Sequence, residues 1–422
     1  MTDSASLWRH PDFLKLWAAK TVSDFGSLIS GAALSFTAII ALKATPFQLG
    51  LLAVSNLLPR FLAGLAAGVW VDRLRRRPLM VAADIGRAVV LLTIPAAAAL
   101  GLLRIEQLYV VAIVTGLLSL LFDVADRSYL PTLIPRADLI DGNSKLTASS
   151  SVAEFSAFSL AGWLVQWISG PMAVLVDSLS FICSAAFIGS IRSGEDPPAP
   201  QTDRRPLWLE ASDGLKVVRN HRVLFTLAIT TLMLGFFGSI VGAVIAAFMV
   251  RDLGFKPGIL GMIWAVGGIG SLCGAAAAGK IARWLGMGRT LAVGILCAGL
   301  GYLIVPLAHG ATIFAGLCLL GNQLITDPGY TIYEINQVSL RQSLVPDSHM
   351  GRVNATFDAV HLGAGLLGAL AGGLLGGWLG LRWTLIIGGG GHIAAALFLW
   401  TSSIRSATGI DHRPSEETHA GV

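Results

Sequence analysis

The sequence predicts an all-α membrane protein in which twelve transmembrane helices form two related bundles of six. Composition is the first indication, because hydrophobic residues make up 54% of the 422 residues and charged residues only 13%, against roughly 25% charged residues in soluble domains. The mean hydropathy is +0.70. A soluble domain of this length could not bury so much apolar surface, so lipid is the expected solvent for most of the chain.

The spacing of apolar segments is the second indication. Each segment has about 20 residues or more, which at about 1.5 Å per residue crosses a hydrocarbon core of about 30 Å. Twelve are expected, at 14–42, 47–71, 79–102, 107–130, 146–168, 171–191, 223–250, 257–282, 289–308, 312–340, 353–377 and 383–404. The first contains Lys20 and Asp24 and runs too long for a secretory signal, so we expect an uncleaved span.

An internal repeat is the third indication. A shift of 211 residues, half the chain, aligns Pro46 with Pro257, Leu49 with Leu260, Gly50 with Gly261, Gly68 with Gly279, Leu133 with Leu344, Pro135 with Pro346, Asn143 with Asn354 and Gly162 with Gly373. The repeat predicts two six-span halves related by an axis along the membrane normal. The expected divisions are an N-terminal bundle at 1–192, a cytoplasmic linker with an amphipathic helix at 193–221, a C-terminal bundle at 222–405 and a disordered tail at 406–422.

The basic residues set the expected orientation. Of the 30 lysines and arginines, 22 flank one side of the spans and only five flank the other. The five are Lys43, Arg104, Arg251, Lys256 and Arg382. This asymmetry predicts a multi-pass protein of the cytoplasmic membrane with both termini in the cytoplasm.

Several classes of function are disfavoured. The net charge of +5 comes from short turns between apolar segments, which indicates orientation and lipid contact rather than nucleic-acid binding. The four cysteines lie within apolar segments without metal-ligand spacing, so neither a metal site nor a disulfide is expected. A partial P-loop match at Gly274–Lys280 has Ile281 in place of the Ser/Thr and no preceding strand. We expect no enzyme, no cofactor and a monomer.

The loop after the second apolar segment carries an unusual charge pattern. Gly64 and Gly68 have the small-xxx-small spacing that allows close helix contact. Asp72 then stands alone among the arginines at 73 and 75–77. A single carboxylate in this position predicts ion pairs, and pairs that form and break can latch a gate.

At this point the chain resembles the major facilitator superfamily over residues 7–405. The superfamily's loop pattern G-x-x-x-D-R-x-G-R-R maps onto Gly68, Asp72, Arg73, Arg76 and Arg77, with Arg75 where the pattern has glycine. The stretches LPRFLAGLAAGVWVDR, SYLPTLIPRADLIDGNSKL and NQVSLRQSLVPDSHMGRVNAT resemble bacterial drug and siderophore exporters, including macrolide-efflux-like and enterobactin-exporter-like members. The resemblance implies the major facilitator fold, in which the first, fourth, seventh and tenth spans line a central cavity and the two halves rock about it.

The resemblance also implies a cytoplasmic gate. Asp72 would face the start of the span at 353–377, near Gly351 and at the positive end of that helix. A loop arginine would meet an acid on the span at 107–130. The gating residues expected on this basis are Gly68, Asp72, Arg73, Arg76, Arg77, Asp123 and Asp126. The alternative is that the basic loop only sets the topology.

Acidic residues inside the spans are candidates for proton coupling. A charge at the bilayer centre costs roughly 2.5–3.5 kcal/mol on insertion scales, so its presence needs a reason. The candidates are Asp24, Glu154, Asp327, Glu334 and Asp358, of which the first three are preferred. The alternative for each is a hydrogen-bonded structural acid that lines water.

Other residues are candidates for the substrate cavity. Arg60 is expected to neutralise one of these proton-coupling candidates or to meet an anionic substrate, and His361, one turn from Asp358, could join a proton relay. The candidate cavity aromatics are Phe25, Phe36, Phe236, Phe237, Tyr330 and Tyr333, for which lipid-facing packing is the alternative. Asp84 and Arg87 are spaced to pair with each other. Asp177 and His392, on outer spans, are expected to be structural.

Together these features predict a secondary transporter. We expect a proton-coupled antiporter that exports a drug-like or siderophore-like compound. Small-molecule substrate, protons and the lipid bilayer are its expected partners. The alternatives are uptake or lipid transport of a small metabolite by the same fold, and a membrane receptor that transports nothing.

Overall fold

The computed structural model describes residues 7–71, 74–193, 207–402 and 404. Within these ranges the chain forms helices and turns and has no strand. The N-terminal half contains η1 (Leu7–Arg9), α1 (Pro11–Phe36), η2 (Thr37–Ala41), α2 (Pro46–Val71), α3 (Arg76–Ala99), α4 (Ile105–Leu133), η3 (Arg136–Asp138), α5 (Leu139–Ile168) and α6 (Gly170–Gly189). The C-terminal half contains α7 (Leu207–Asn220), α8 (Arg222–Ala247), η4 (Phe248–Asp252), α9 (Pro257–Leu285), α10 (Met287–Ile304), η5 (Val305–Leu307), α11 (Ile313–Leu344), α12 (Asp347–Trp378) and α13 (Leu381–Thr401).

Every predicted span corresponds to a long helix. Among the described residues, nine helices are long and apolar enough to cross a membrane. The other three predicted spans, α2, α5 and α11, have 26, 30 and 32 residues. Two helices begin earlier than the apolar pattern predicts. α5 starts at Leu139 rather than at residue 146, and α12 starts at Asp347 rather than at residue 353. The first turns of α5 are polar, and Lys145 pairs with Asp141 one turn away on the same helix.

The repeat in the sequence is also visible in local geometry. α1 and α8 begin with the same cap, since His10 Nδ1 accepts from Phe13 N at 3.1 Å and His221 Nδ1 accepts from Leu224 N at 3.4 Å. Both helices end in a π-helical segment, η2 and η4. These features are 211 residues apart, so the two halves repeat backbone detail as well as residue type.

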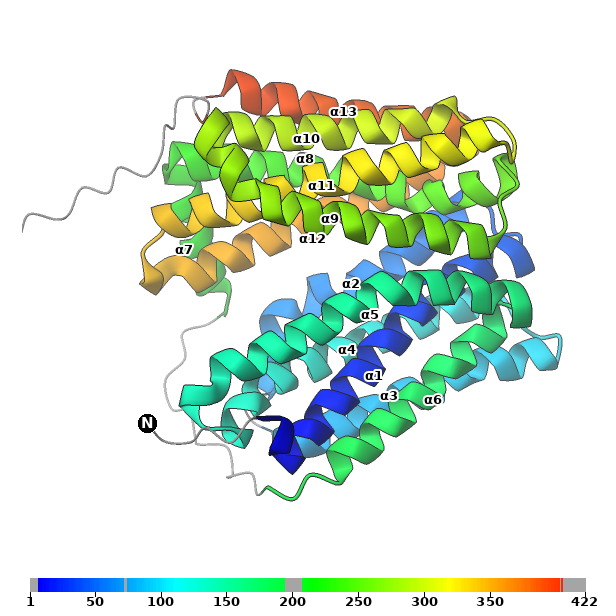
Figure 1. Ribbon diagram of the computed structural model, residues 1–422, viewed down its shortest axis with the longest axis vertical. Coiled ribbons are helices and arrows are strands. Elements are labelled where there is room, and N and C mark those ends of the chain that lie inside the picture. Colours follow the sequence, from blue (N-terminus) through cyan, green and yellow to red (C-terminus); the bar gives the residue numbers. More distant parts are fainter. Residues whose placement is uncertain (1–6, 72–73, 194–206, 403, 405–422) are drawn as a thin grey trace, which may run out of the picture.

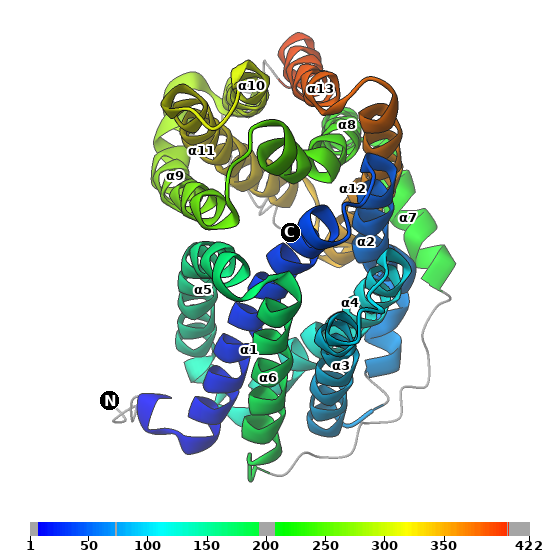
Figure 2. The same cartoon turned by 90° about the vertical axis from the view of Figure 1, so that its right-hand side faces the viewer.

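The helices form two bundles (Figure 1). In the first, α1 packs on α5 and α6, and α4 packs on α2 and α3. In the second, α8 packs on α12 and α13, and α11 packs on α9 and α10. The halves meet mainly where α2 packs on α12 and α5 packs on α9, as Figure 2 shows.

Among the described residues, the two halves share a buried core at one end only. We call the end that holds η2 and η4 the closed end, and the end that holds η1 and α7 the linker end. At the closed end, one cluster joins Ile29 and Phe36 of the first half to Phe248 and Leu260 of the second. At the linker end each half has a cluster of its own. The molecule is therefore shut at the closed end, and the sequence predicts that the linker end is cytoplasmic.

Glycines make the contact at the closed end possible. A Cβ atom added to Gly50 would lie 2.6 Å from the Ala369 oxygen and 2.9 Å from the Gly373 Cα. Gly162 and Gly261 form the equivalent close approach between α5 and α9. Only glycine lets the helix backbones come this near.

The predicted amphipathic helix is present as α7. It packs against α12 and α8. Gly214 lies on α12 so closely that a Cβ atom there would be 2.5 Å from the Arg352 oxygen and 2.6 Å from Thr356 Oγ1. α7 is thus attached to the linker end of the second bundle.

Candidate functional site

A cluster of charges lies inside the first bundle, between α1 and α4. Lys20 Nζ is 3.0 Å from Asp126 Oδ2 and 3.9 Å from Asp24 Oδ1. The side chain of Asp126 is 7% exposed, whereas those of Lys20 and Asp24 are 20% and 29% exposed. Lys20 thus lies close to two carboxylates, of which Asp126 is buried and Asp24 is partly exposed to solvent.

α5 completes this cluster. Ser150 Oγ donates a hydrogen bond to Asp24 Oδ2 at 2.6 Å. Nearer the linker end, Trp17 Nε1 of α1 donates to Ser149 Oγ at 2.7 Å. Asp24 lies near the middle of the 26-residue α1, so the polar contact is made deep within the span. We call Lys20, Asp24, Asp126 and Ser150 the acid cluster.

A second ion pair lies beside the acid cluster. Arg60 Nη2 of α2 is 3.7 Å from Asp123 Oδ2 of α4, and the side chains are 58% and 40% exposed. Arg60 was expected to neutralise a proton-coupling candidate or to meet an anionic substrate, and in this structure it pairs with Asp123. Its partner is an acid expected at the gate rather than one of the proton-coupling candidates.

The second bundle also carries acids within its helices, one of them at a repeat position. Gln337 Nε2 donates to Glu334 Oε2 at 3.1 Å, and Gln323 Nε2 donates to Asp327 Oδ2 at 3.2 Å. Asp358 of α12 follows Phe357, whose ring centre lies 4.7 Å from the guanidinium of Arg341 on α11. Glu334 follows Asp123 by 211 residues. Both halves therefore place an acid at this point of the repeat. Glu154, the remaining candidate, lies outside the described side chains.

The expected gate is described only in part. Asp72 and Arg73 lie outside the described residues, as does the side-chain environment of Gly68. Arg77 Nε donates to the Ile188 oxygen at 3.1 Å and Arg77 Nη2 donates to the Gly189 oxygen, and these contacts attach α3 to the carbonyl end of α6. Asp126 pairs with Lys20 in this conformation. The expected contacts between the loop arginines and the acids of α4 stay a prediction for a conformation that is shut at the linker end.

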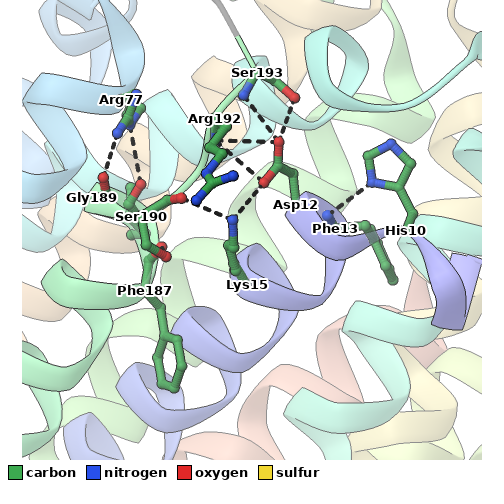
Figure 3. A network of polar contacts seen from close by, with 11 residues as sticks. His10, Asp12, Phe13, Lys15, Arg77, Phe187, Gly189, Ser190, Arg192 and Ser193 are labelled. Atoms are coloured by element: carbon green, nitrogen blue, oxygen red, sulfur yellow. Dashed lines mark hydrogen bonds and ion pairs between the residues drawn. The ribbon is translucent and has the colours of Figure 1, made fainter.

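Sequence reasoning missed a polar network at the start of α1 (Figure 3). Asp12 accepts hydrogen bonds from Lys15 Nζ at 2.8 Å, Ser193 N at 3.0 Å and Ser193 Oγ at 2.7 Å. Lys15 Nζ also donates to the Ser190 oxygen at 2.8 Å. The network fixes the beginning of α1 to the residues that follow α6. Because its partners are largely backbone groups, the only signal in the sequence was an acid in a first helical turn.

The candidate aromatics occupy different environments. Phe36 and Tyr333 are each only 1% exposed, so neither lines an accessible cavity in this conformation. Phe36 stacks on Trp264 at the closed end, with ring centroids 5.7 Å apart. Phe237 packs against Gly391 of the outer helix α13. The assignment of these three residues to the substrate cavity stays a prediction, since sequence does not give the rotation of a helix about its axis.

The other three aromatics are, like Phe237, partly accessible. Phe25 packs against the core of the closed end. Phe236 contacts the Phe237 ring edge to face, with centroids 5.2 Å apart. Tyr330 lies 6.3 Å from the Tyr333 ring. They stay candidates for substrate contact.

A hollow of about 620 Å³ lies on α5 towards the linker end. Its lining residues are Ile140, Asn143, Ser144, Thr147 and Ala148. Ser144 precedes Gly162 by about five helical turns, so the hollow lies on the face of α5 that packs on α9 at the closed end. The same face is therefore covered by α9 at one end of the helix and open at the other.

The paired charges on α3 are structural, as predicted. Arg87 Nη2 pairs with Asp84 Oδ1, and both side chains are almost fully buried. The Arg87 guanidinium lies between the rings of Phe122 and Phe181, at 4.5 and 4.0 Å from their centroids. Asp177 on α6 is also buried. This network holds the outer helices of the first bundle together, away from the acid cluster.

Comparison with known proteins identifies the family. A model described as Major Facilitator Superfamily matches residues 16–361. The chain belongs to the Major Facilitator Superfamily. It is a multi-pass cell-membrane protein with the family and fold of transporters, not enzymes, and major facilitator transporters bind small-molecule substrates within a lipid bilayer.

Curated relatives of this major facilitator protein cover nearly its whole length. It is 26% identical over 393 residues to the "Uncharacterized MFS-type transporter YfiS" of Bacillus subtilis (strain 168), with 89% of each chain covered. It is 24% identical over 385 residues to the "Multidrug efflux pump Tap" of Mycolicibacterium fortuitum, covering 90% of this chain and 92% of Tap.

Solved structures show the same fold. The nucleoside transporter NupG matches with a TM-score of 0.77 at 13% identity, covering 92% of this chain and 98% of NupG. A bacterial homologue of the iron transporter ferroportin, in an inward-facing state, matches with a TM-score of 0.76 at 18% identity, covering 95% of this chain and 100% of that one. At such identities the likeness concerns the fold alone.

Proposed function

We propose that this major facilitator protein is a proton-coupled exporter of a drug-like or siderophore-like organic compound, working by alternating access. The acid cluster carries the proposal. A carboxylate near the middle of a span is costly, and Asp24 is partly accessible and contacts Ser150 and a lysine that Asp126 shares.

Asp24 is the proposed coupling residue because its two protonation states interact differently with its neighbours. The ionised carboxylate accepts from Ser150 and attracts Lys20. When Asp24 is protonated, it no longer attracts Lys20, which then pairs with Asp126. Proton and substrate then compete for one site, since an amphipathic substrate with a basic or hydrogen-bonding group would use the same carboxylate. This competition converts inward proton movement into outward substrate movement.

The opening at the linker end supports a role in collecting substrate from one side. In the described part of the chain each half has a buried core of its own there, and the exposed Arg60–Asp123 pair lies beside the acid cluster. If the linker end is cytoplasmic, as the arginine and lysine distribution predicts, this conformation takes up substrate from the cell. The gating residues around Asp72 would shut this side when the closed end opens, and the similarity to the pump Tap supports export.

The proposal is tested in inverted membrane vesicles under an imposed pH gradient, with a panel of labelled amphipathic compounds. We expect at least one compound to accumulate, an uncoupler to abolish accumulation, and Asp24→Asn to remove the dependence on the gradient. Asp141→Asn is the matched control, because Asp141 is an exposed acid that pairs with Lys145 outside the acid cluster. Accumulation that persists without a gradient would contradict proton coupling, and net movement in the opposite direction would indicate uptake.

A further inference from the structure

The closed end contains a pair of equivalent backbone irregularities. α1 ends in the π-helical segment η2 and α8 ends in η4. The amide of Leu42 donates to the Thr37 oxygen at 3.0 Å, and the amide of Leu253 donates to the Phe248 oxygen at 3.0 Å. π-helical turns are rare and occur often at functional sites. Here one stands at the tip of each half, where the halves meet.

One hydrogen bond connects these two tips across the halves. Arg251 Nη2, in η4, donates to the backbone oxygen of Ile39, in η2, at 2.8 Å. The last carbonyl groups of a helix lack a helical donor, and the guanidinium satisfies one of them. The position equivalent to Arg251 in the first half is Ile40, which has no donor. The contact is therefore made from one half only.

Arg251 lies on the side of the spans that carries few lysines and arginines. Only five lysines and arginines flank the closed end, because positive charge is normally kept on the cytoplasmic side. A second one, Arg382, has a comparable role within a single half: it donates to the oxygens of Pro306 and Ala308 and lies 5.2 Å from the centre of the Phe248 ring. Arg251 differs because its acceptor belongs to the other half.

Contacts between uncharged groups also join the two halves at the closed end. Phe36 stacks on Trp264, and Gly258 N donates to Gln166 Oε1 at 3.0 Å. If two rigid bundles separate at this end, the exposed Arg251 contact must break together with them. A hydrogen bond from a charged donor is worth about 1.5–3 kcal/mol, and solvent exposure places this one at the lower end of that range.

We propose that Arg251 is the latch of the closed end, and that its bond to the Ile39 carbonyl sets how often this end opens. The inference rests on alternating access, which is part of the proposed function, but it requires neither protons nor a particular substrate. Arg251 is a positioning residue in this scheme, since it acts on the conformation and not on the transported compound.

The distance between the two halves at the closed end tests the latch directly. Spin labels on Lys43→Cys and Lys256→Cys, both exposed and on opposite halves, report this distance in a protein whose four native cysteines have been replaced. Without substrate, Arg251→Met should raise the ratio of open to closed molecules about tenfold. Arg382→Met is the matched control, because its carbonyl contacts stay within the second half, and it should leave the ratio unchanged.

A gain-of-contact variant tests the same idea even if Arg251→Met fails to fold. Ile40→Arg places a guanidinium at the equivalent position of the first half and should shift the ratio towards closed molecules. Equal distance distributions for Arg251→Met and the unchanged protein would overturn the latch, as would equal shifts for Arg251→Met and Arg382→Met. Because no gradient is applied, loss of proton coupling in the vesicle assay would not affect this result.

Discussion

Removal of Lys20 provides a quantitative test of the acid cluster. Lys20 Nζ lies 3.0 Å from Asp126 Oδ2, and the side chains are only 20% and 7% exposed. Breaking a buried ion pair from one side costs about 3–5 kcal/mol, because the remaining charge is left without a partner. Since Lys20 keeps some exposure, we expect Lys20→Met to lower the free energy of unfolding by about 3 kcal/mol.

Thermal melting in detergent measures this effect, and the melting temperature should fall on the order of 5 °C. The double variant Lys20→Met with Asp126→Asn should recover most of the loss, because it also removes the stranded carboxylate. Lys145→Met is the control, since its partner Asp141 is exposed and such pairs contribute about 0.2–1 kcal/mol. The single variant Asp126→Asn completes the comparison. If its loss and the loss of Lys20→Met simply add in the double variant, the two side chains are not coupled, which would contradict the expected ion pair.

Three further predictions follow from close contacts elsewhere in the molecule. Arg87→Met leaves the buried Asp84 without its partner and should reduce the free energy of unfolding by about 3–5 kcal/mol in the same melting assay; a loss no larger than that of a surface arginine would contradict this. Gly50→Val places a methyl group against the Ala369 oxygen, so the spin-label distance across the closed end should lengthen, and an unchanged distance would show that the contact is not tight. Gly214→Leu should detach α7 and speed backbone hydrogen exchange there; unchanged rates would show that docking does not depend on this glycine.

The long helices were predictable because a membrane span must satisfy its own backbone and present an apolar surface of known length. The repeat was predictable for a related reason, since glycines at equivalent positions make equivalent contacts. Gly50 and Gly261 align in sequence, and in the structure each meets a glycine of the opposite half. The polar first turns of α5 were missed because hydropathy does not detect helix outside the lipid.

The pairing of charges was not predictable in the same way. Asp126 was expected to meet an arginine of the loop, whereas Lys20 of α1 is its partner in this conformation. That choice depends on how α1 and α4 are rotated and on which end of the molecule is shut, and neither is encoded in a local pattern. Lys20 itself had a signal, because a lysine four residues before an acid inside a span is costly unless it is paired. The Arg251 contact had none, since its acceptor is a backbone oxygen.

The central claim is that Asp24 exchanges a proton for substrate, and the most direct test is to count protons. A transported compound from the vesicle assay is added to purified protein in weakly buffered detergent, and a pH-indicator dye records release. At a pH low enough for Asp24 to carry a proton before binding, we expect release of up to one proton per bound molecule, as for competition at a single carboxylate, and no release from Asp24→Asn while binding persists. Equal release from both proteins would contradict this claim and would move the coupling site away from α1.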